Sequence, residues 1–93
     1  MGMFDQLKDL NEMRKQAKQM QLMLAQEEVE GKSAGGKITI VVDGNQEPKN
    51  VIVDDSIVGD RGEIARNIKE ALSDVSKKHK KMLQKKFGGM MGQ

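Results

Sequence analysis

Lys37-Ile38-Thr39-Ile40-Val41-Val42-Asp43-Gly44 is the stretch that decides the fold. Its residues are mostly β-branched and nearly alternate in polarity, which predicts a strand over about 37–43. Gly35-Gly36 directly before it is typical of a tight hairpin turn. A short strand over about 28–34 is therefore expected to pair with the central one.

A third strand is predicted on the other side of the central one. Gly44 to Pro48 forms a loop, and Asn50-Val51-Ile52-Val53-Asp54 then predicts a strand over about 49–54. Three strands with short links indicate an antiparallel meander.

One long helix is predicted before the strands in the sequence, and a second one after them. Residues 4–26 contain neither Gly nor Pro and consist mainly of good helix formers. Residues 61–86 again follow helical spacing, with Asp60 and Glu63 in a capping-box-like arrangement and Gly88-Gly89 at the end. We therefore expect one α+β domain over 1–93, in the order α-β-β-β-α, with a loose tail at 88–93.

Apolar side chains at helical spacing mark a seam for dimerisation or for pairing of the helices. Its members are Leu10, Met13, Ala17, Met20, Leu24, Ile64, Ile68 and Val75. Each helix should measure ~35–39 Å and overhang strands of ~20–27 Å. Paired along their stripes, the helices would run antiparallel. The start of the first and the end of the second would then share one free end, away from the sheet.

Composition excludes several classes of protein. The chain has 93 residues, and one copy this short buries a modest core, a shortage that oligomerisation often remedies. The absence of Cys excludes disulfides, a thiolate nucleophile and a Cys-based zinc site. No secretory signal or membrane-length apolar run is visible, so a cytoplasmic location without membrane contact is expected.

The net charge of +2 conceals an asymmetry along the chain. Residues 1–26 carry four basic and three acidic side chains, and residues 27–60 carry three and eight. Residues 61–93 carry nine basic and three acidic side chains, a net charge of +6. A basic C-terminal third therefore follows an acidic middle.

The candidate binding site is the lysine run of the second helix. It consists of Lys77, Lys78, Lys80, Lys81, Lys85 and Lys86. Such a run suits phosphate contact with counterion release. It is equally typical of a solvated helix end whose lysines complement the helix dipole. Lys8, Arg14, Lys15 and Lys18 of the first helix would extend the basic surface, or would be ordinary solvated side chains.

No catalytic or metal-binding constellation is visible. His79 is the single histidine and has no evident partner, which favours an ordinary helix position at the edge of the stripe. Asp54, Asp55 and Asp60 fit turn and cap roles better than a cation site. Gly35-Gly36-Lys37 lacks the rest of a P-loop. We therefore expect no enzyme activity, no cofactor, no metal and no small-molecule substrate.

An ordered set of segments resembles the YbaB/EbfC family of nucleoid-associated proteins. The segments are Gln16-Ala17-Lys18-Gln19-Met20-Gln21, Glu30-Gly31-Lys32-Ser33-Ala34-Gly35-Gly36, the strand ending in Gly44, Val51-Ile52-Val53-Asp54-Asp55-Ser56-Ile57-Val58, and the Gly/Met-rich tail. Two departures are Asp55, where members often carry Pro, and a short tail.

The resemblance implies a homodimer whose helices project like tweezers and bind double-stranded DNA with weak sequence preference. It also implies association with the nucleoid and effects on gene expression. The rival interpretation is a protein-interaction adaptor, in which the two helices form a chaperone-like clamp for a partner's helix or acidic segment.

Overall fold

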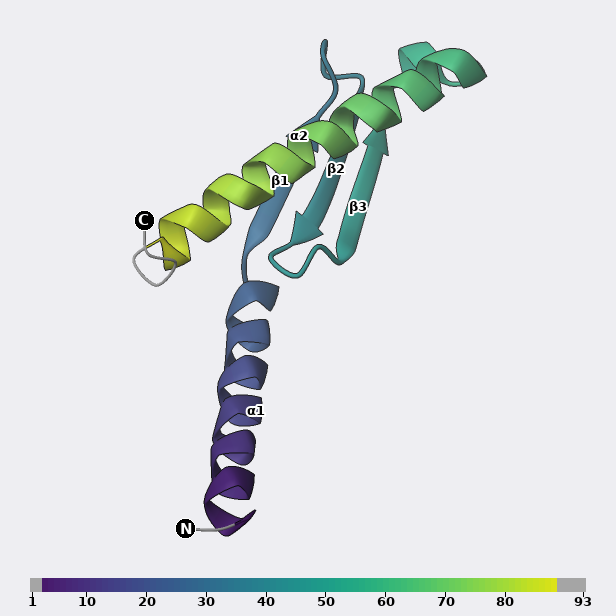
Figure 1. Cartoon of the computed structure of the whole chain (residues 1–93). Coiled ribbons are helices and arrows are strands. Elements are labelled where there is room, and N and C mark those ends of the chain that lie inside the picture. Colours follow the sequence, from purple (N-terminus) through teal and green to yellow (C-terminus); the bar gives the residue numbers. More distant parts are fainter. Residues whose placement is uncertain (1–2, 89–93) are drawn as a thin grey trace.

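The computed structural model describes the backbone of residues 3–88 and the side chains of residues 8–88. Its elements are α1 (Met3–Ala25), β1 (Glu28–Lys32), β2 (Ile38–Asp43), β3 (Pro48–Val53), a 3₁₀ turn η1 (Asp55–Ile57) and α2 (Arg61–Phe87). The predicted α-β-β-β-α order is confirmed (Figure 1). Of the expected tail at 88–93, residues 89–93 lie outside the described residues.

The three strands form one antiparallel sheet in the order β1-β2-β3. Val29 pairs with Val42 across the first hairpin, and Ile40 pairs with Val51 across the second. Gly35 and Gly36 both have positive φ, at 87° and 72°, which L-residues with a Cβ rarely adopt. These glycines allow the tight link that brings β1 back alongside β2.

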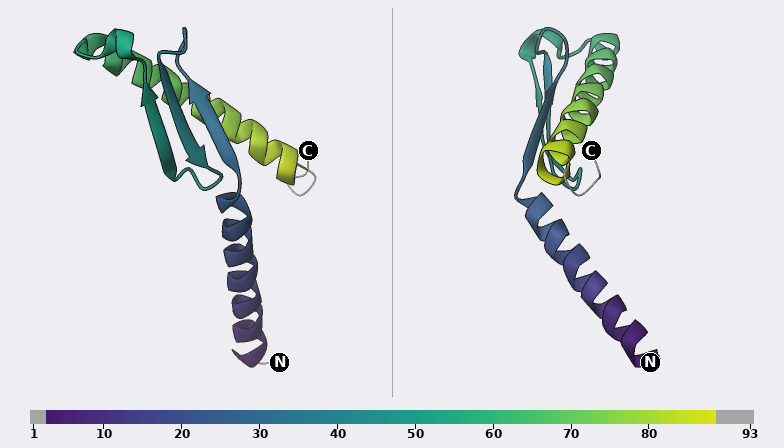
Figure 2. Two further views of the ribbon diagram at one scale, coloured as in Figure 1. Left: turned by 180° about the vertical axis from the view of Figure 1, so that it is seen from behind. Right: turned by 60° about the vertical axis from the view of Figure 1, so that its left-hand side comes forward.

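Helix α2 lies diagonally across one face of the sheet (Figures 1 and 2). Its buried residues are Asn67, Ala71, Val75 and His79, at intervals of one helical turn. They pack mainly over β1 and β2, where Val29, Ile38, Ile40 and Val42 supply the apolar core. The seam residue Val75 therefore belongs to the core of a single chain, and Ile64 packs against the same core.

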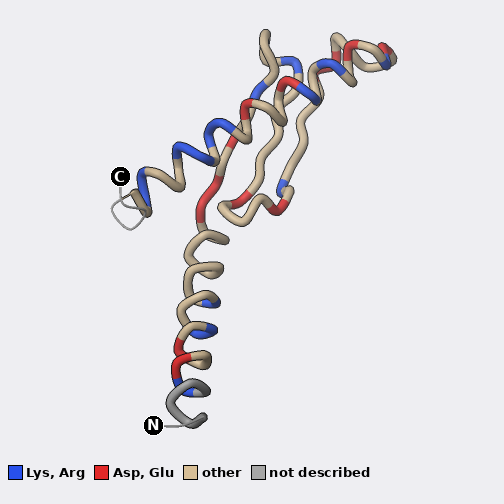
Figure 3. The backbone as a smooth tube through the Cα atoms, viewed as in Figure 1, with Lys and Arg blue, Asp and Glu red and all other residues tan. Residues whose placement is uncertain are grey.

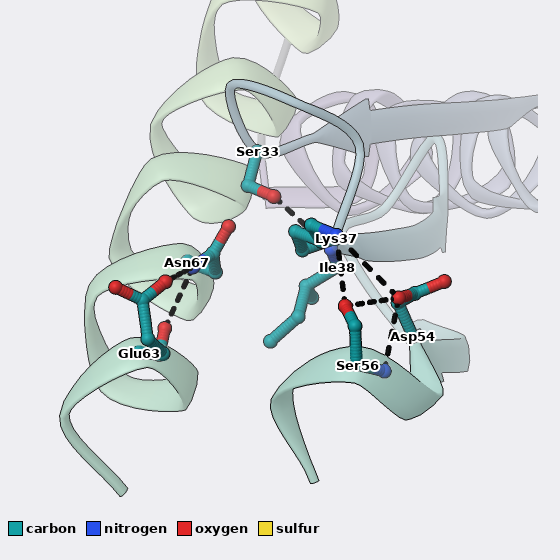
Figure 4. A network of polar contacts seen from close by, with 7 residues as sticks. All are labelled: Ser33, Lys37, Ile38, Asp54, Ser56, Glu63 and Asn67. Carbon is teal, nitrogen blue, oxygen red and sulfur yellow. Dashed lines mark hydrogen bonds and ion pairs between the residues drawn. The ribbon is translucent and has the colours of Figure 1, made fainter. Parts of the chain in front are cut away.

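Polar contacts gather at the hairpin end of the sheet, at η1 and in the first turns of α2 (Figure 4). Ser33 Oγ accepts a hydrogen bond from Ile38 N at 3.0 Å, and Lys37 Nζ donates to Ser56 Oγ at 2.8 Å. Asn67 Nδ2 donates to the Glu63 carbonyl at 2.7 Å. The Lys37–Ser56 bond joins the hairpin to η1, whereas the Asn67–Glu63 bond lies within α2.

The predicted cap roles of the aspartates are confirmed. Asp54 accepts from Ser56 N at the start of η1, and Asp60 Oδ1 accepts from Glu63 N at 3.1 Å as the N-cap of α2. The turn η1 was not predicted from the sequence. It buries Ile57 in the core and so fixes the path from β3 into α2.

Helix α1 projects from the sheet and does not pair with α2 along its length (Figures 1 and 2). The expected antiparallel helix pair within one chain is therefore wrong. The direction of α2 is set by its apolar face on the sheet, whereas the described side chains of α1 remain almost entirely exposed. The molecule is consequently elongated, with principal extents of 65 × 26 × 19 Å.

Candidate nucleic-acid interface

The lysine run occupies the C-terminal part of α2. All six side chains are exposed, and no carboxylate interrupts the sequence from Lys77 to Phe87. Figure 3 shows this concentration of positive charge on the part of α2 that passes beyond β1. The preceding half of α2, residues 61–76, balances three basic against three acidic side chains. Charge is therefore concentrated at one end of a continuous rigid helix.

Two of these lysines have acidic partners. Lys78 Nζ lies 2.9 Å from Asp74 Oδ2, and Lys86 forms an ion pair with Glu27. Within the described part of the chain, Lys77, Lys80, Lys81 and Lys85 have no carboxylate within ion-pair distance. Close like-charged pairs on a helix cost about 0.2–0.5 kcal/mol each. A polyanion would relieve this repulsion.

Asp74 contributes to the structure more than to the charge balance of the site. The backbone N–H of Lys32 donates to Asp74 Oδ2 at 2.9 Å, and this bond, with that from Lys78, holds the pKa of Asp74 below its ordinary value. The carboxylate ties the edge strand β1 to α2. It therefore fixes where the lysine run leaves the sheet.

A second basic stretch lies on α1. Arg14, Lys15 and Lys18 are exposed, and residues 13–26 contain no acidic side chain. Lys8 is exposed but lies close in sequence to Asp9 and Glu12. The middle of α1 is therefore its most basic part.

The position of the lysine run relative to α1 corrects the prediction of a shared free end. Phe87 lines a hollow with Gln16, Gln19, Met20 and Met23, which belong to the C-terminal half of α1. The Lys86–Glu27 ion pair likewise joins the end of α2 to the segment between α1 and β1. The lysine run thus lies beside the base of α1, and the start of α1 is remote from it.

His79 lies within the lysine run, but its side chain is buried at 8% exposure. Its Nε2 is 2.7 Å from the carbonyl oxygen of Gly44, and its Nδ1 is 3.1 Å from the amide nitrogen of Gln46. The sequence predicts an ordinary helix position at the edge of the stripe, and the structure places His79 on the buried face with two hydrogen-bond partners that the sequence does not reveal. Spacing of four from Val75 places His79 on the buried face, which was the available signal in the sequence.

Apolar seam residues outside the core remain uncovered. Leu10, Met13, Ala17 and Met20 of α1 are exposed, and Leu24 is half-buried. On α2, Ile68 and Leu72 border a groove of about 370 Å³ whose floor includes Ile40, Val42 and Val51. All six residues of β3 are exposed, because α2 covers mainly the other two strands.

The described side chains offer few aromatic rings on which bases could stack. Phe87 is half-buried beside the C-terminal half of α1, and the side chain of Phe4 lies outside the described residues. The chain has no Trp or Tyr, and stacking of single-stranded bases usually needs exposed aromatic rings. Among the side chains of residues 8–88, no cluster of three potential metal ligands occurs. No helix in the described part of the chain is long and apolar enough to cross a membrane.

The fold and its two basic helical stretches define a small α+β protein suited to contact with an extended anion. A model of the YbaB/EbfC DNA-binding family matches residues 1–93, so the chain belongs to this family. Its structure is similar to the crystal structure of uncharacterized protein HP0035 from Helicobacter pylori. The two share 22% sequence identity and a TM-score of 0.78, over 98% of each chain. That second similarity concerns the fold.

Proposed function

We propose that the protein is a homodimer that binds duplex DNA through the lysine run of α2 and the basic stretch of α1. The main support is that four exposed lysines at one end of α2 lack carboxylate partners among the described side chains. They are Lys77, Lys80, Lys81 and Lys85. Membership of a DNA-binding family specifies the polyanion. The contacts are made to phosphates by Lys77, Lys78, Lys80, Lys81, Lys85 and Lys86, with Lys8, Arg14, Lys15 and Lys18 extending the surface.

Weak sequence preference follows from the chemistry of these side chains. Lysine ammonium groups neutralise phosphates, whereas base identity is read by contacts to base edges in the grooves. Binding of this kind suits a protein that coats or organises DNA throughout the nucleoid. Effects on gene expression then arise from occupancy of the DNA rather than from recognition of one operator.

The dimer is supported by apolar surface that one chain leaves uncovered. Leu72 and Val51, which both line the groove, are 51% and 52% exposed. We assign the groove to a second copy of the chain. In a two-fold dimer the same surface patch of both copies meets, so the Ile68 and Leu72 side of one copy would enter the groove of the other. The apolar stripe of α1 provides a second contact, since an isolated helix gains little stability from propensity alone.

Matched triple variants test the DNA contact. Lys77, Lys81 and Lys85 are changed to Gln in one protein, and Arg61, Arg66 and Lys69 are changed to Gln in the control. Both variants lose three positive charges from exposed positions of α2, so the overall field changes equally. We expect fluorescence anisotropy with a labelled duplex to show a large loss of affinity for the first variant and a small loss for the control.

Equal losses in the two variants would contradict a localised contact. The adaptor interpretation makes a different prediction for the same assay. It requires that the wild-type protein bind an acidic peptide tightly at about 150 mM salt and fail to bind the duplex there.

A further inference from the structure

Both basic helices are hydrogen-bonded to one short loop, the β2–β3 loop at Gly44-Asn45-Gln46. Gly44 N donates to the Leu24 carbonyl at 2.8 Å, and Asn45 Nδ2 donates to the Gln21 carbonyl at 2.9 Å. The Leu24 carbonyl is one of the last four of α1, which have no N–H four residues on within the helix, and it also accepts from Glu27 N at 3.0 Å. Gln21 lies one turn earlier. The loop therefore caps α1.

The same loop holds α2 through His79. A carbonyl oxygen only accepts, so His79 Nε2 carries the proton and donates to Gly44 O, while Nδ1 accepts from Gln46 Nε2. The backbone of Gly44 is thus hydrogen-bonded through its N–H to α1 and through its carbonyl to α2. His79 lies between Lys78 and Lys80, so this bond fixes α2 within the first turn of the lysine run.

The loop is held in one conformation. Asp43 Oδ1 accepts from Asn45 N at 2.8 Å and from Glu47 N at 3.0 Å. Gln46 has φ of 66°, a left-handed conformation that costs energy for a residue with a Cβ. A Cβ at Gly44 would lie 2.5 Å from the Leu24 carbonyl oxygen, so only glycine fits this contact. These constraints suit a joint that must hold an angle.

We propose that the β2–β3 loop is the joint that sets the angle between α1 and the lysine run, with His79 as a positioning residue for DNA binding. This inference rests on the proposed function. Arg14 lies eleven residues from the end of α1, or ~17 Å along the helix. A tilt of ~10° at the joint would move Arg14 by ~3 Å, close to the ~3.4 Å of duplex axis that each phosphate of one strand occupies.

The test measures the angle and DNA binding separately. Because the chain has no Cys, spin labels can be attached at Asn11→Cys on α1 and Gln84→Cys on α2. Diluting labelled protein into an excess of unlabelled protein isolates the distance within one chain. The joint variants are His79→Leu, which removes both hydrogen bonds, His79→Gln, which keeps one donor and one acceptor, and Gln46→Ala, which removes one bond at an exposed position.

We expect His79→Leu to broaden or shift the distance without DNA and to lower duplex affinity about tenfold. The salt slope should become shallower by about 0.9 for each phosphate that the variant no longer neutralises. His79→Gln should restore much of both, and Gln46→Ala should show a smaller shift. The control is Ile57→Ala, which weakens the core far from the joint. It should leave the distance and the duplex affinity of the folded protein unchanged.

An unchanged distance between the two spin labels in folded His79→Leu and Gln46→Ala would overturn the proposal that this loop sets the angle. So would an equal loss of DNA binding in Ile57→Ala at matched folded fractions. Failure of the proposed function is distinguishable, because it would appear as absent duplex binding by the wild-type protein, whatever the distance shows.

Discussion

Leu72→Ala provides the sharpest test of the proposed dimer. Leu72 borders the apolar groove and is 51% exposed in a single chain. Burying a whole leucine side chain is worth about 1.5–3 kcal/mol, so covering the exposed half is worth about 1 kcal/mol. A two-fold interface contains Leu72 twice, so the substitution should lower the free energy of dimerisation by about 2 kcal/mol. The dissociation constant of the dimer should then be roughly 30-fold larger.

Sedimentation equilibrium over a dilution series measures this constant for the wild type and the variant. The matched control is Val58→Ala, since Val58 is 67% exposed and lies outside the groove residues. The control should dimerise like the wild type. An unchanged constant for Leu72→Ala would remove Leu72 from the interface, and a wild-type mass of 10.3 kDa at micromolar concentration would refute the dimer itself.

Three further predictions concern stability and use urea unfolding. Gly31→Ala should cost about 1–3 kcal/mol of unfolding free energy, because a Cβ there would lie 2.6 Å from both Ala71 O and Val75 N. In the control Gly62→Ala the new Cβ meets its nearest atom at 3.6 Å, so this variant should not be destabilised. Equal effects would exclude close helix–sheet packing as the cause. For Asp43, burial alone would raise the pKa, but hydrogen bonds from Glu47 N and Asn45 N and the nearby Lys49 ammonium lower it below its ordinary 3.8. This carboxylate therefore stabilises the fold above about pH 3.8 and less as pH falls further. The deficit of Asp43→Asn should be full at neutral pH and shrink in acid, and a pH-independent deficit would contradict it. Asp60→Ala should cost about 1 kcal/mol through loss of the N-cap, and no change would show that the cap of α2 contributes nothing.

The strands and both helices could be predicted because each has a strong local signal. The β-branched run at 38–42 and the glycine pair at 35–36 determine the central hairpin without reference to the rest of the chain. The caps at Asp54 and Asp60 are equally local, since each carboxylate bonds to a backbone N–H two or three residues away. Chemistry within a few residues is what a single sequence displays best.

The relative direction of the helices could not be predicted, because it depends on long-range packing. The apolar stripe of α2 was visible, but its partner is the sheet rather than α1. Gly31 allows α2 to approach β1 closely, and this role is apparent only when Val75 lies opposite. The role of His79 was missed for the same reason, since Gly44 and Gln46 lie more than thirty residues away in sequence.

The salt dependence of duplex binding tests the central claim most directly. The affinities of the wild type and the Lys77, Lys81 and Lys85→Gln variant are measured across a series of salt concentrations. Each phosphate contact contributes about 0.9 to the slope of log affinity against log salt concentration. We predict a steep wild-type slope that becomes shallower in the variant by at least about 0.9. Identical slopes, or a wild-type slope near zero, would contradict phosphate contact by the lysine run of α2.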